Sequence, residues 1–317
     1  MRALITGGLG FIGNALVKRL LAQGHECHIV DNCINNCWQP DDAARSGAVV
    51  HAPVPVSEYD LASGPDFDVV YHLASPVGPV GVLQWAGEMA SMIVSDTHAL
   101  ARYCIEKRAK LINISTSEIY GQNVDNQAQR EDIDKIVPAE VTIRLEYAVA
   151  KLTSEILLTN LAKVHPLKHV TIRPFNVAGP SQRGEVGFVT PRFIELALSN
   201  EPITVFGDGL QERCFTHVED IVDSILALAE SKISNEVFNV GNPQNIVSIL
   251  DLAKMVKEMT SSQSSIIFVD PKELFGPHYA EAYNKIPSIE KVTSLTSWRP
   301  SRSLHQILVD VIESVRG

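Results

Sequence analysis

Tyr147 and Lys151 are residues whose types and spacing suit proton-transfer chemistry. They stand four positions apart, so on a helix both side chains lie on one face. An ammonium beside a phenol stabilises the phenolate, which predicts a lowered pKa for the Tyr147 hydroxyl. Such a phenol can accept a proton from a carbinol while a hydride leaves for a nicotinamide. Because this spacing is common on exposed helix faces, the interpretation depends on the other motifs.

A glycine-rich segment near the start of the chain joins a predicted strand over 2–6 to a predicted helix over 11–21. Gly7, Gly10 and Gly13 follow the spacing GxxGxxG. The first glycine permits a tight turn, the second lets backbone amides approach a pyrophosphate, and the third lets the helix pack closely on the sheet. The helix N-terminus then offers unpaired N–H groups to the phosphates.

Asp31 stands at the end of the second predicted strand, followed by Asn32. A carboxylate at this position can accept hydrogen bonds from both ribose hydroxyls and repels a 2′-phosphate, so the cofactor predicted is NAD, not NADP. Asp60 is a further candidate for a contact with the adenine, although an acidic residue of a surface loop is almost as good an interpretation.

The elements that must position these residues alternate in type along the first half of the chain. Helices separating strands predict an α/β fold with a Rossmann-type, doubly wound parallel sheet. We expect strands over 2–6, 27–30, 68–71, 110–114 and 169–172, and helices over 11–21, 89–107 and 146–164.

Beyond Pro174 the pattern loosens, and proline and glycine become frequent up to Gly209. We expect residues 1–175 to bind NAD, with a returning segment near 215–241, and residues 176–317 to form mainly a smaller, interleaved substrate lobe. Helices are expected over 191–198 and 218–228, and strands over 236–240 and 266–269.

Composition limits the possible partners. The chain has 317 residues, 45% of them hydrophobic, and a net charge of -10, which argues against nucleic-acid binding. Prolines and glycines break the uncharged stretch over 69–87, so no membrane helix is expected. The lack of a signal peptide and of any CxxC pair predicts a cytoplasmic protein with reduced thiols and no metal site. The cysteines are Cys27, Cys33, Cys37, Cys104 and Cys214.

Thr116, Ser117 and Glu118 follow the predicted strand over 110–114. Strand ends of such sheets face the ligand crevice, where hydroxyls can bond a reacting sugar oxygen. The alternative is a Ser/Thr turn that caps the next segment.

Together, these residues resemble the extended short-chain dehydrogenase/reductase family of sugar-nucleotide epimerases, dehydratases and decarboxylases. The resemblance covers nearly the whole chain. It rests on TGGLGFIG at 6–13, YHLASP at 71–76, STSEIYG at 115–121, YAVAK at 147–151, RPFNVAGP at 173–180, FGDGLQERCFTHVEDI at 206–221 and VFNVGNP at 237–243.

This resemblance implies roles for individual residues. Tyr147 is the base, Lys151 its partner and a holder of the nicotinamide ribose, and Thr116 the hydroxyl of the family's Ser/Thr position. Further cofactor contacts are implied for Phe11, Ile12, Leu73, Ala74 and Ser75. Substrate contacts are implied for Asn176, Arg192, Arg213 and Lys285, where an Arg fork suits phosphate oxygens. The substrate is then a nucleotide sugar, with UDP favoured, and the assembly a homodimer.

All enzymes of this kind oxidise C4 of the sugar first. The Thr116–Glu118 trio is similar to that of UDP-glucuronate decarboxylases, while 4,6-dehydratases, in which Glu118 would take the C5 proton, and 4-epimerases stay open as alternatives. Lys285 stands where decarboxylases carry Arg, and Ile93–Thr97 lacks the Asn and Gly of the family's NxxGT segment. These departures also leave open a non-catalytic NAD-binding protein. A further alternative is a reductase that acts on a non-nucleotide carbonyl.

Overall fold

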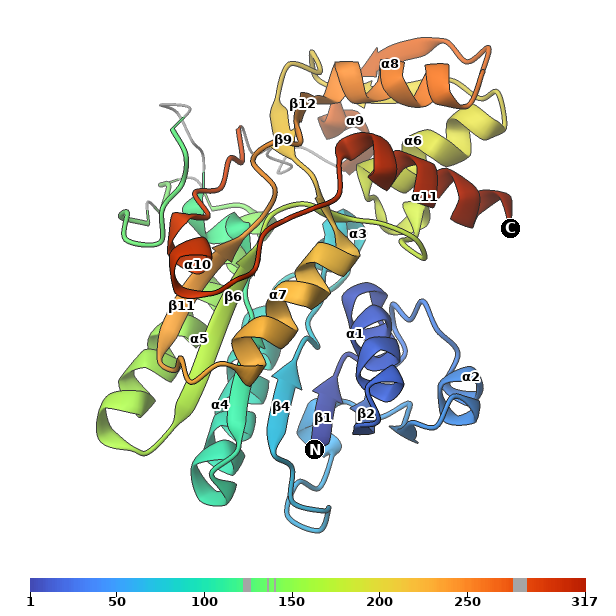
Figure 1. The fold of residues 1–317 in the computed structure, drawn as a ribbon. Coiled ribbons are helices and arrows are strands. Elements are labelled where there is room, and N and C mark those ends of the chain that lie inside the picture. Colours follow the sequence, from blue (N-terminus) through green and yellow to red (C-terminus); the bar gives the residue numbers. More distant parts are fainter. Residues whose placement is uncertain (122–126, 136, 140, 276–283) are drawn as a thin grey trace.

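The computed structural model describes residues 1–121, 127–135, 137–139, 141–275 and 284–317. Its centre is a seven-stranded, wholly parallel sheet in the order β11-β6-β5-β4-β1-β2-β3, which confirms the predicted fold (Figure 1). Its strands are β1 (Arg2–Thr6), β2 (Glu26–Val30), β3 (Val49–His51), β4 (Val69–His72), β5 (Lys110–Ile114), β6 (Lys168–Pro174) and β11 (Glu236–Val240).

Helices cover both faces of this sheet, which explains why its strands are apolar without alternation. Ala3 and Ile5 of β1 pack in the core on one face, and Leu4, pointing the other way, belongs to the core on the opposite face. The first face carries α1 (Phe11–Ala22) and α7 (Val218–Glu230), and the second α4 (Met89–Lys107) and α5 (Ile143–Val164).

The start of α5 differs from the expected Glu146. The helix begins at Ile143 because the Thr142 hydroxyl accepts a hydrogen bond from the backbone N–H of Leu145, at 3.2 Å. A threonine in this position satisfies an N–H that has no partner inside the helix. The sequence pattern missed this cap because the charged residues Arg144 and Glu146 interrupt the apolar ones of the first turn, Ile143 and Leu145.

The second lobe lies beyond the carboxyl ends of the strands and contains the C-terminus (Figure 1). Its core includes the fully buried side chains of Phe193, Leu252 and Ile307, one from each of its three longest helices. These are α6 (Val189–Leu198), α8 (Ile249–Met259) and α11 (Leu304–Arg316), beside the parallel pair β8 (Ile203–Phe206) and β13 (Ile266–Val269). The predicted strand over 266–269 is therefore confirmed, but it pairs with β8 outside the main sheet.

Shorter elements connect the two parts of the molecule. β9 (Glu212–Cys214) pairs with β12 (Ile246–Ser248), and β7 (Val177–Ala178) pairs with β10 (Thr216–His217). The remaining elements are α2 (Pro40–Arg45), α3 (Gly78–Gln84), α9 (Pro271–Phe275), α10 (Glu290–Leu295), η1 (Val56–Glu58), η2 (Ser117–Tyr120) and η3 (Gly184–Val186).

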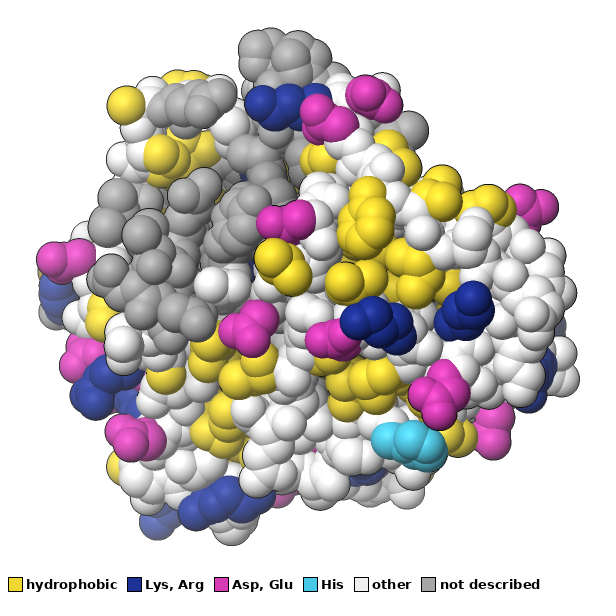
Figure 2. Space-filling model, turned by 90° about the horizontal axis from the view of Figure 1, so that it is seen from above, with side chains coloured by type: hydrophobic (Ala, Val, Ile, Leu, Met, Phe, Trp, Pro, Cys, Tyr) yellow, Lys and Arg dark blue, Asp and Glu magenta, His cyan; other side chains and the backbone are white. Residues whose placement is uncertain are grey.

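Several whole-molecule properties bear on function. No helix in the described ranges is both long and apolar enough to span a bilayer. All five cysteines are free thiols, and the described residues contain no cluster of three His, Cys, Asp or Glu suited to a metal ion. On the face shown in Figure 2, the described basic side chains stand among acidic and apolar ones without forming a continuous patch.

Candidate active site

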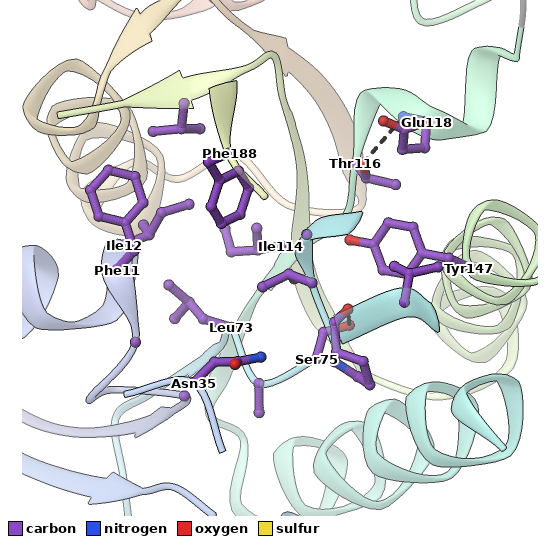
Figure 3. A pocket seen from close by; sticks show the side chains of 18 of the residues that line it. Phe11, Ile12, Asn35, Leu73, Ser75, Ile114, Thr116, Glu118, Tyr147 and Phe188 are labelled. Carbon is purple, nitrogen blue, oxygen red and sulfur yellow. Dashed lines mark hydrogen bonds between the residues drawn. The ribbon is translucent and has the colours of Figure 1, made fainter. Parts of the chain in front are cut away.

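A cavity of about 680 Å³ lies at the carboxyl ends of the central strands. Strand order reverses there between β1 and β4, which is where ligands bind in doubly wound sheets. Figure 3 shows Tyr147, Thr116 and Ser75 around this space, with Phe11 and Phe188 on the opposite side. Residues of the second lobe, among them Phe206 and Arg213, complete the wall.

The glycine loop forms a close-fitting turn at the start of α1. Gly7 has a φ of +71°, and a Cβ there would lie 2.7 Å from the backbone nitrogen of Ala74. A Cβ on Gly13 would collide with the carbonyl oxygen of Gly7. Gly10 caps α1 without any side-chain hydrogen bond, so the first N–H groups of the helix remain for an anion. This cradle fits the pyrophosphate of NAD.

Asp31 is held rigidly in the same cavity. Its two carboxylate oxygens accept hydrogen bonds from the backbone N–H groups of Leu9, at 3.0 Å, and Cys33, at 2.8 Å. Burial raises its pKa, and these two hydrogen bonds oppose the rise. A fixed, buried carboxylate beside the glycine loop fits a ribose diol, and neighbouring Asn32 also lines the cavity.

Tyr147 lies in the wall, and its phenol forms side-chain hydrogen bonds with Thr116 and Ser75. Burial raises its pKa, the Glu118 charge adds to the rise, and the two hydrogen bonds lower it only partly. The expectation that Lys151 lowers this pKa is therefore wrong for this structure. The Lys151 ammonium instead donates to the carbonyl of Ile114, at 2.9 Å.

Lys151 itself is buried, and burial lowers its pKa to about 8 against the opposing charges of Glu155 and Asp96. Glu155 is already engaged with Arg173, at 2.6 Å, and with the Ser115 hydroxyl. The charge of Lys151 therefore changes close to neutral pH.

Glu118 is clamped between two cations. Arg144 forms a bidentate pair with its carboxylate, at 2.7 and 2.9 Å, and the Lys285 ammonium forms a second ion pair with it. Burial alone would raise the Glu118 pKa, but the charges and hydrogen bonds of Arg144 and Lys285 outweigh burial and hold the pKa far below its ordinary value. Glu118 is therefore ionised at neutral pH.

Lys285 lies behind the wall, contrary to the expected direct substrate contact. Its side chain is 2% exposed, and it is not among the residues that line the cavity. Its backbone forms a parallel bridge with Arg213, and its ammonium reaches Glu118.

Asp60 is the other predicted residue outside the cavity wall. It is exposed, and its carboxylate accepts hydrogen bonds from the backbone N–H groups of Ala62 and Ser63, at 3.0 and 3.2 Å. These contacts make it a turn residue, so the expected adenine contact is not supported. Val56 and Ser57 of the preceding η1 line the cavity instead.

The predicted substrate-binding residues of the second lobe reach the wall from separate segments. The Asn176 amide donates to the carbonyl of Cys214, at 3.3 Å. Arg192 lies over the ring of Phe206, at 4.2 Å, and bonds Thr204. The predicted residues that line the cavity are Gly7, Gly10, Phe11, Ile12, Gly13, Asp31, Asn32, Leu73, Ala74, Ser75, Thr116, Ser117, Glu118, Tyr147, Lys151, Asn176, Arg192 and Arg213.

Comparison with known proteins identifies the group to which this fold and site belong. Residues 3–241 match the model of the NAD dependent epimerase/dehydratase family. The chain belongs to this family. UDP-N-acetyl-alpha-D-glucosaminuronate decarboxylase of Bacillus cytotoxicus is 31% identical over 99% of this chain and 98% of its own length. UDP-glucuronic acid decarboxylase 2 of Arabidopsis thaliana is 30% identical over 100% of this chain and 68% of its own.

Solved structures of this epimerase/dehydratase family agree with the fold. UDP-glucose 4-epimerase of Thermotoga maritima, determined with UDP-glucose, has a TM-score of 0.87 and 28% identity, covering 100% of this chain and 99% of its own. UDP-glucuronic acid 4-epimerase of Bacillus cereus, in complex with UDP-glucuronic acid and NAD, has a TM-score of 0.84 and 28% identity, with the same coverage. The cofactor of the present family member is NAD.

Sequence reasoning did not assign a site role to several residues that line the cavity of this family member. Arg144 had a local signal, since it stands three positions before Tyr147, and Asp96 lies in the altered NxxGT segment. Asn35 and Phe188 come from loops whose sequence carries no such signal.

Proposed function

We propose that this enzyme decarboxylates a nucleotide-linked hexuronic acid, UDP-glucuronate or its 2-N-acetylated counterpart. The observation that carries the proposal is the cluster around Glu118. Arg144 and Lys285 bring two positive charges to its carboxylate, and the charge of Arg213 lies close enough to act on Lys285. Arg144 and Arg213 also line the cavity, so this end of it favours an anionic sugar.

The state of Glu118 separates decarboxylation from dehydration. A 4,6-dehydratase needs a base that removes the C5 proton, and Glu118 would have to give up two cations to serve as one. Decarboxylation needs no such base. A ketone at C4 stands β to the C6 carboxylate, so the electron pair left by departing CO2 delocalises onto the C4 oxygen.

The chain's own residues would act at C4 and at the sugar carboxylate. Tyr147, oriented by Thr116 and Ser75, exchanges a proton with the C4 oxygen. Arg144, held in place by Glu118, faces the carboxylate that is lost. The chemistry that bound NAD supplies is hydride exchange at C4. We assign NAD binding to residues 1–175 with the returning strand β11, and substrate binding mainly to 176–317.

The two relatives named above support this assignment, because the name of each describes a decarboxylase of a UDP-linked uronic acid. The second candidate is a 4-epimerase, favoured by the similarity to the 4-epimerases of Thermotoga maritima and Bacillus cereus. An epimerase changes configuration at C4 without losing mass.

The test is mass spectrometry of the product formed with NAD from UDP-glucuronate, UDP-N-acetylglucosaminuronate and, as a neutral control, UDP-glucose. We expect loss of CO2 from one or both uronates and no change in UDP-glucose. A product of unchanged mass that separates chromatographically as the C4 epimer would support the second candidate. Loss of water would overturn the role given to Glu118. Tyr147→Phe, which lacks the proton-exchanging hydroxyl, is the inactive control.

We also propose that the enzyme is a cytoplasmic homodimer. Five free thiols suit a reducing compartment. Val149 and Ile156 are apolar side chains of α5 that are 37% and 53% exposed, and Thr153 between them is also exposed on the same helical face. Ile156→Glu should convert the dimer to a monomer in light scattering. A wild-type monomer would overturn the assembly and leave the chemistry untouched.

A further inference from the structure

Asp96 is a carboxylate of the cavity wall that the chemistry above does not use. It lies on α4, is half-buried and lines the cavity. In the described part of the chain, no protein group donates a hydrogen bond to it. It occupies the position of the glycine in the family's NxxGT segment, so this carboxylate is an addition to the family pattern.

The turn of α4 that carries Asp96 is fixed by its neighbour Thr97. The Thr97 hydroxyl donates to the carbonyl of Ile93, at 2.7 Å, and lies 3.2 Å from the hydroxyl of Ser154 on α5 and 3.3 Å from the ring of His72 on β4. The backbone at position 96 is thereby tied to both elements that pack against it. Asp96 is held toward the cavity by a rigid support.

The charged group that acts on Asp96 is Lys151 of α5. Burial raises the Asp96 pKa to about 6, and Lys151 opposes the rise, so Asp96 is ionised at neutral pH. His72 behind Thr97 is neutral, because burial lowers its pKa to about 3. An ionised, half-buried carboxylate without a donor is costly unless a ligand supplies one.

We propose that Asp96 is a cofactor-binding residue whose carboxylate accepts a hydrogen bond from a hydroxyl of the ribose next to nicotinamide. Asp31 and the glycine loop account for the adenosine and pyrophosphate end of the cavity. Asp96 instead neighbours Lys151 and the Tyr147 helix, at the reacting end. The site then holds one carboxylate for each ribose of NAD.

Three probes locate the contact without relying on turnover. NAD and ADP-ribose both carry the second ribose, only NAD carries the carboxamide, and ADP carries neither. Calorimetry on protein freed of cofactor would compare wild type with Asp96→Ala, Asp31→Asn and Glu106→Ala. Glu106 is an exposed acid of the same helix and serves as the matched control. The circular dichroism spectrum and the thermal unfolding temperature of each variant, compared with those of wild type, show whether the fold is intact.

For Asp96→Ala we expect NAD and ADP-ribose to bind about 10- to 100-fold more weakly, as for loss of a hydrogen bond to a charged group, with ADP unchanged. Asp31→Asn should weaken all three probes, and Glu106→Ala none. Equal losses for ADP would move the contact to the other ribose and overturn the proposal. So would a loss confined to NAD, which would indicate the carboxamide, or NAD affinity that is unchanged or tighter.

Discussion

The ammonium of Lys285 and the carboxylate of Glu118, 167 positions apart in sequence, form an ion pair behind the cavity wall. Lys285 is fully enclosed, and burial lowers its pKa to about 8 while the Glu118 charge opposes that fall. The pair connects the segment around Lys285, whose backbone bridges Arg213 of β9, to the strand-end loop that carries Thr116 and Ser117. Arg144 and Lys285 therefore hold the same carboxylate, although of these two cations only Arg144 lines the cavity.

Lys285→Met should destabilise the protein. Removing one partner of a buried ion pair costs about 3–5 kcal/mol when the other charge is left alone, and Arg144 remains here, so we expect the free energy of unfolding to fall by about 2–3 kcal/mol. Urea denaturation measures this loss. The control is Lys254→Met, which removes an exposed pair with Asp251 and should lower the free energy of unfolding far less. Equal, small losses would show that the buried pair is not a structural connection.

Tyr147→Phe should lower turnover by about 10²–10⁴-fold, the usual contribution of general acid–base catalysis, while NAD affinity stays within about twofold of wild type. Steady-state rates and fluorescence titration of NAD measure the two effects. Tyr59→Phe, a half-buried tyrosine outside the cavity wall, is the control. Substantial activity in Tyr147→Phe would remove the proposed role of the phenol.

Turnover should fall as the pH rises through about 8. The Lys151 ammonium is present below its pKa of about 8 and is lost above it, and with it a positive charge of the cavity wall. Lys151→Arg keeps a positive charge throughout this range. The turnover of this variant should therefore not fall as the pH rises through about 8, even if its maximum turnover is lower than that of wild type. If turnover of Lys151→Arg still falls above about pH 8, the fall is due to the titration of another group. Lys285, with a pKa of about 8, is the first to examine.

Gly7→Ala should abolish NAD binding, and Gly24→Ala should not. Both glycines have positive φ, +71° and +77°, so both substitutions introduce the same backbone strain of about 1–3 kcal/mol. Only at position 7 would the new Cβ meet neighbours, 2.7 Å from the backbone of Ala74. Calorimetry with NAD and thermal unfolding separate the two effects. Similar NAD affinity in both variants would contradict the close-turn explanation.

Much of the fold and cofactor site could be predicted because the signals are local. Gly7, Gly13 and Asp31 lie in one strand–turn–helix–strand unit, where steric needs dictate residue type, and the structure brings them to one cavity. The returning strand over 236–240 was predictable from its apolar run and joins β6 in the sheet.

What escaped prediction depends on packing between distant segments. Lys285 resembled a substrate ligand, but its orientation is set by a bridge to Arg213 and by Glu118. The Tyr147 pKa is set mainly by burial, and the i, i+4 spacing to Lys151 gives no information about burial. The sequence left Asp60 open between an adenine contact and an acidic residue of a surface loop. In the structure its carboxylate accepts hydrogen bonds from backbone N–H groups of its own turn.

The placement of β11 constrains how the polypeptide acquires its structure during synthesis. The edge of β6 is completed by residues 236–240, which follow the first segments of the second lobe in sequence. A nascent chain that ends near Phe175 therefore exposes an unpaired, apolar strand edge, the kind of surface that templates aggregation. Folding of the cofactor sheet must wait for some sixty further residues, so the two lobes should mature together and a truncated N-terminal half should require a chaperone.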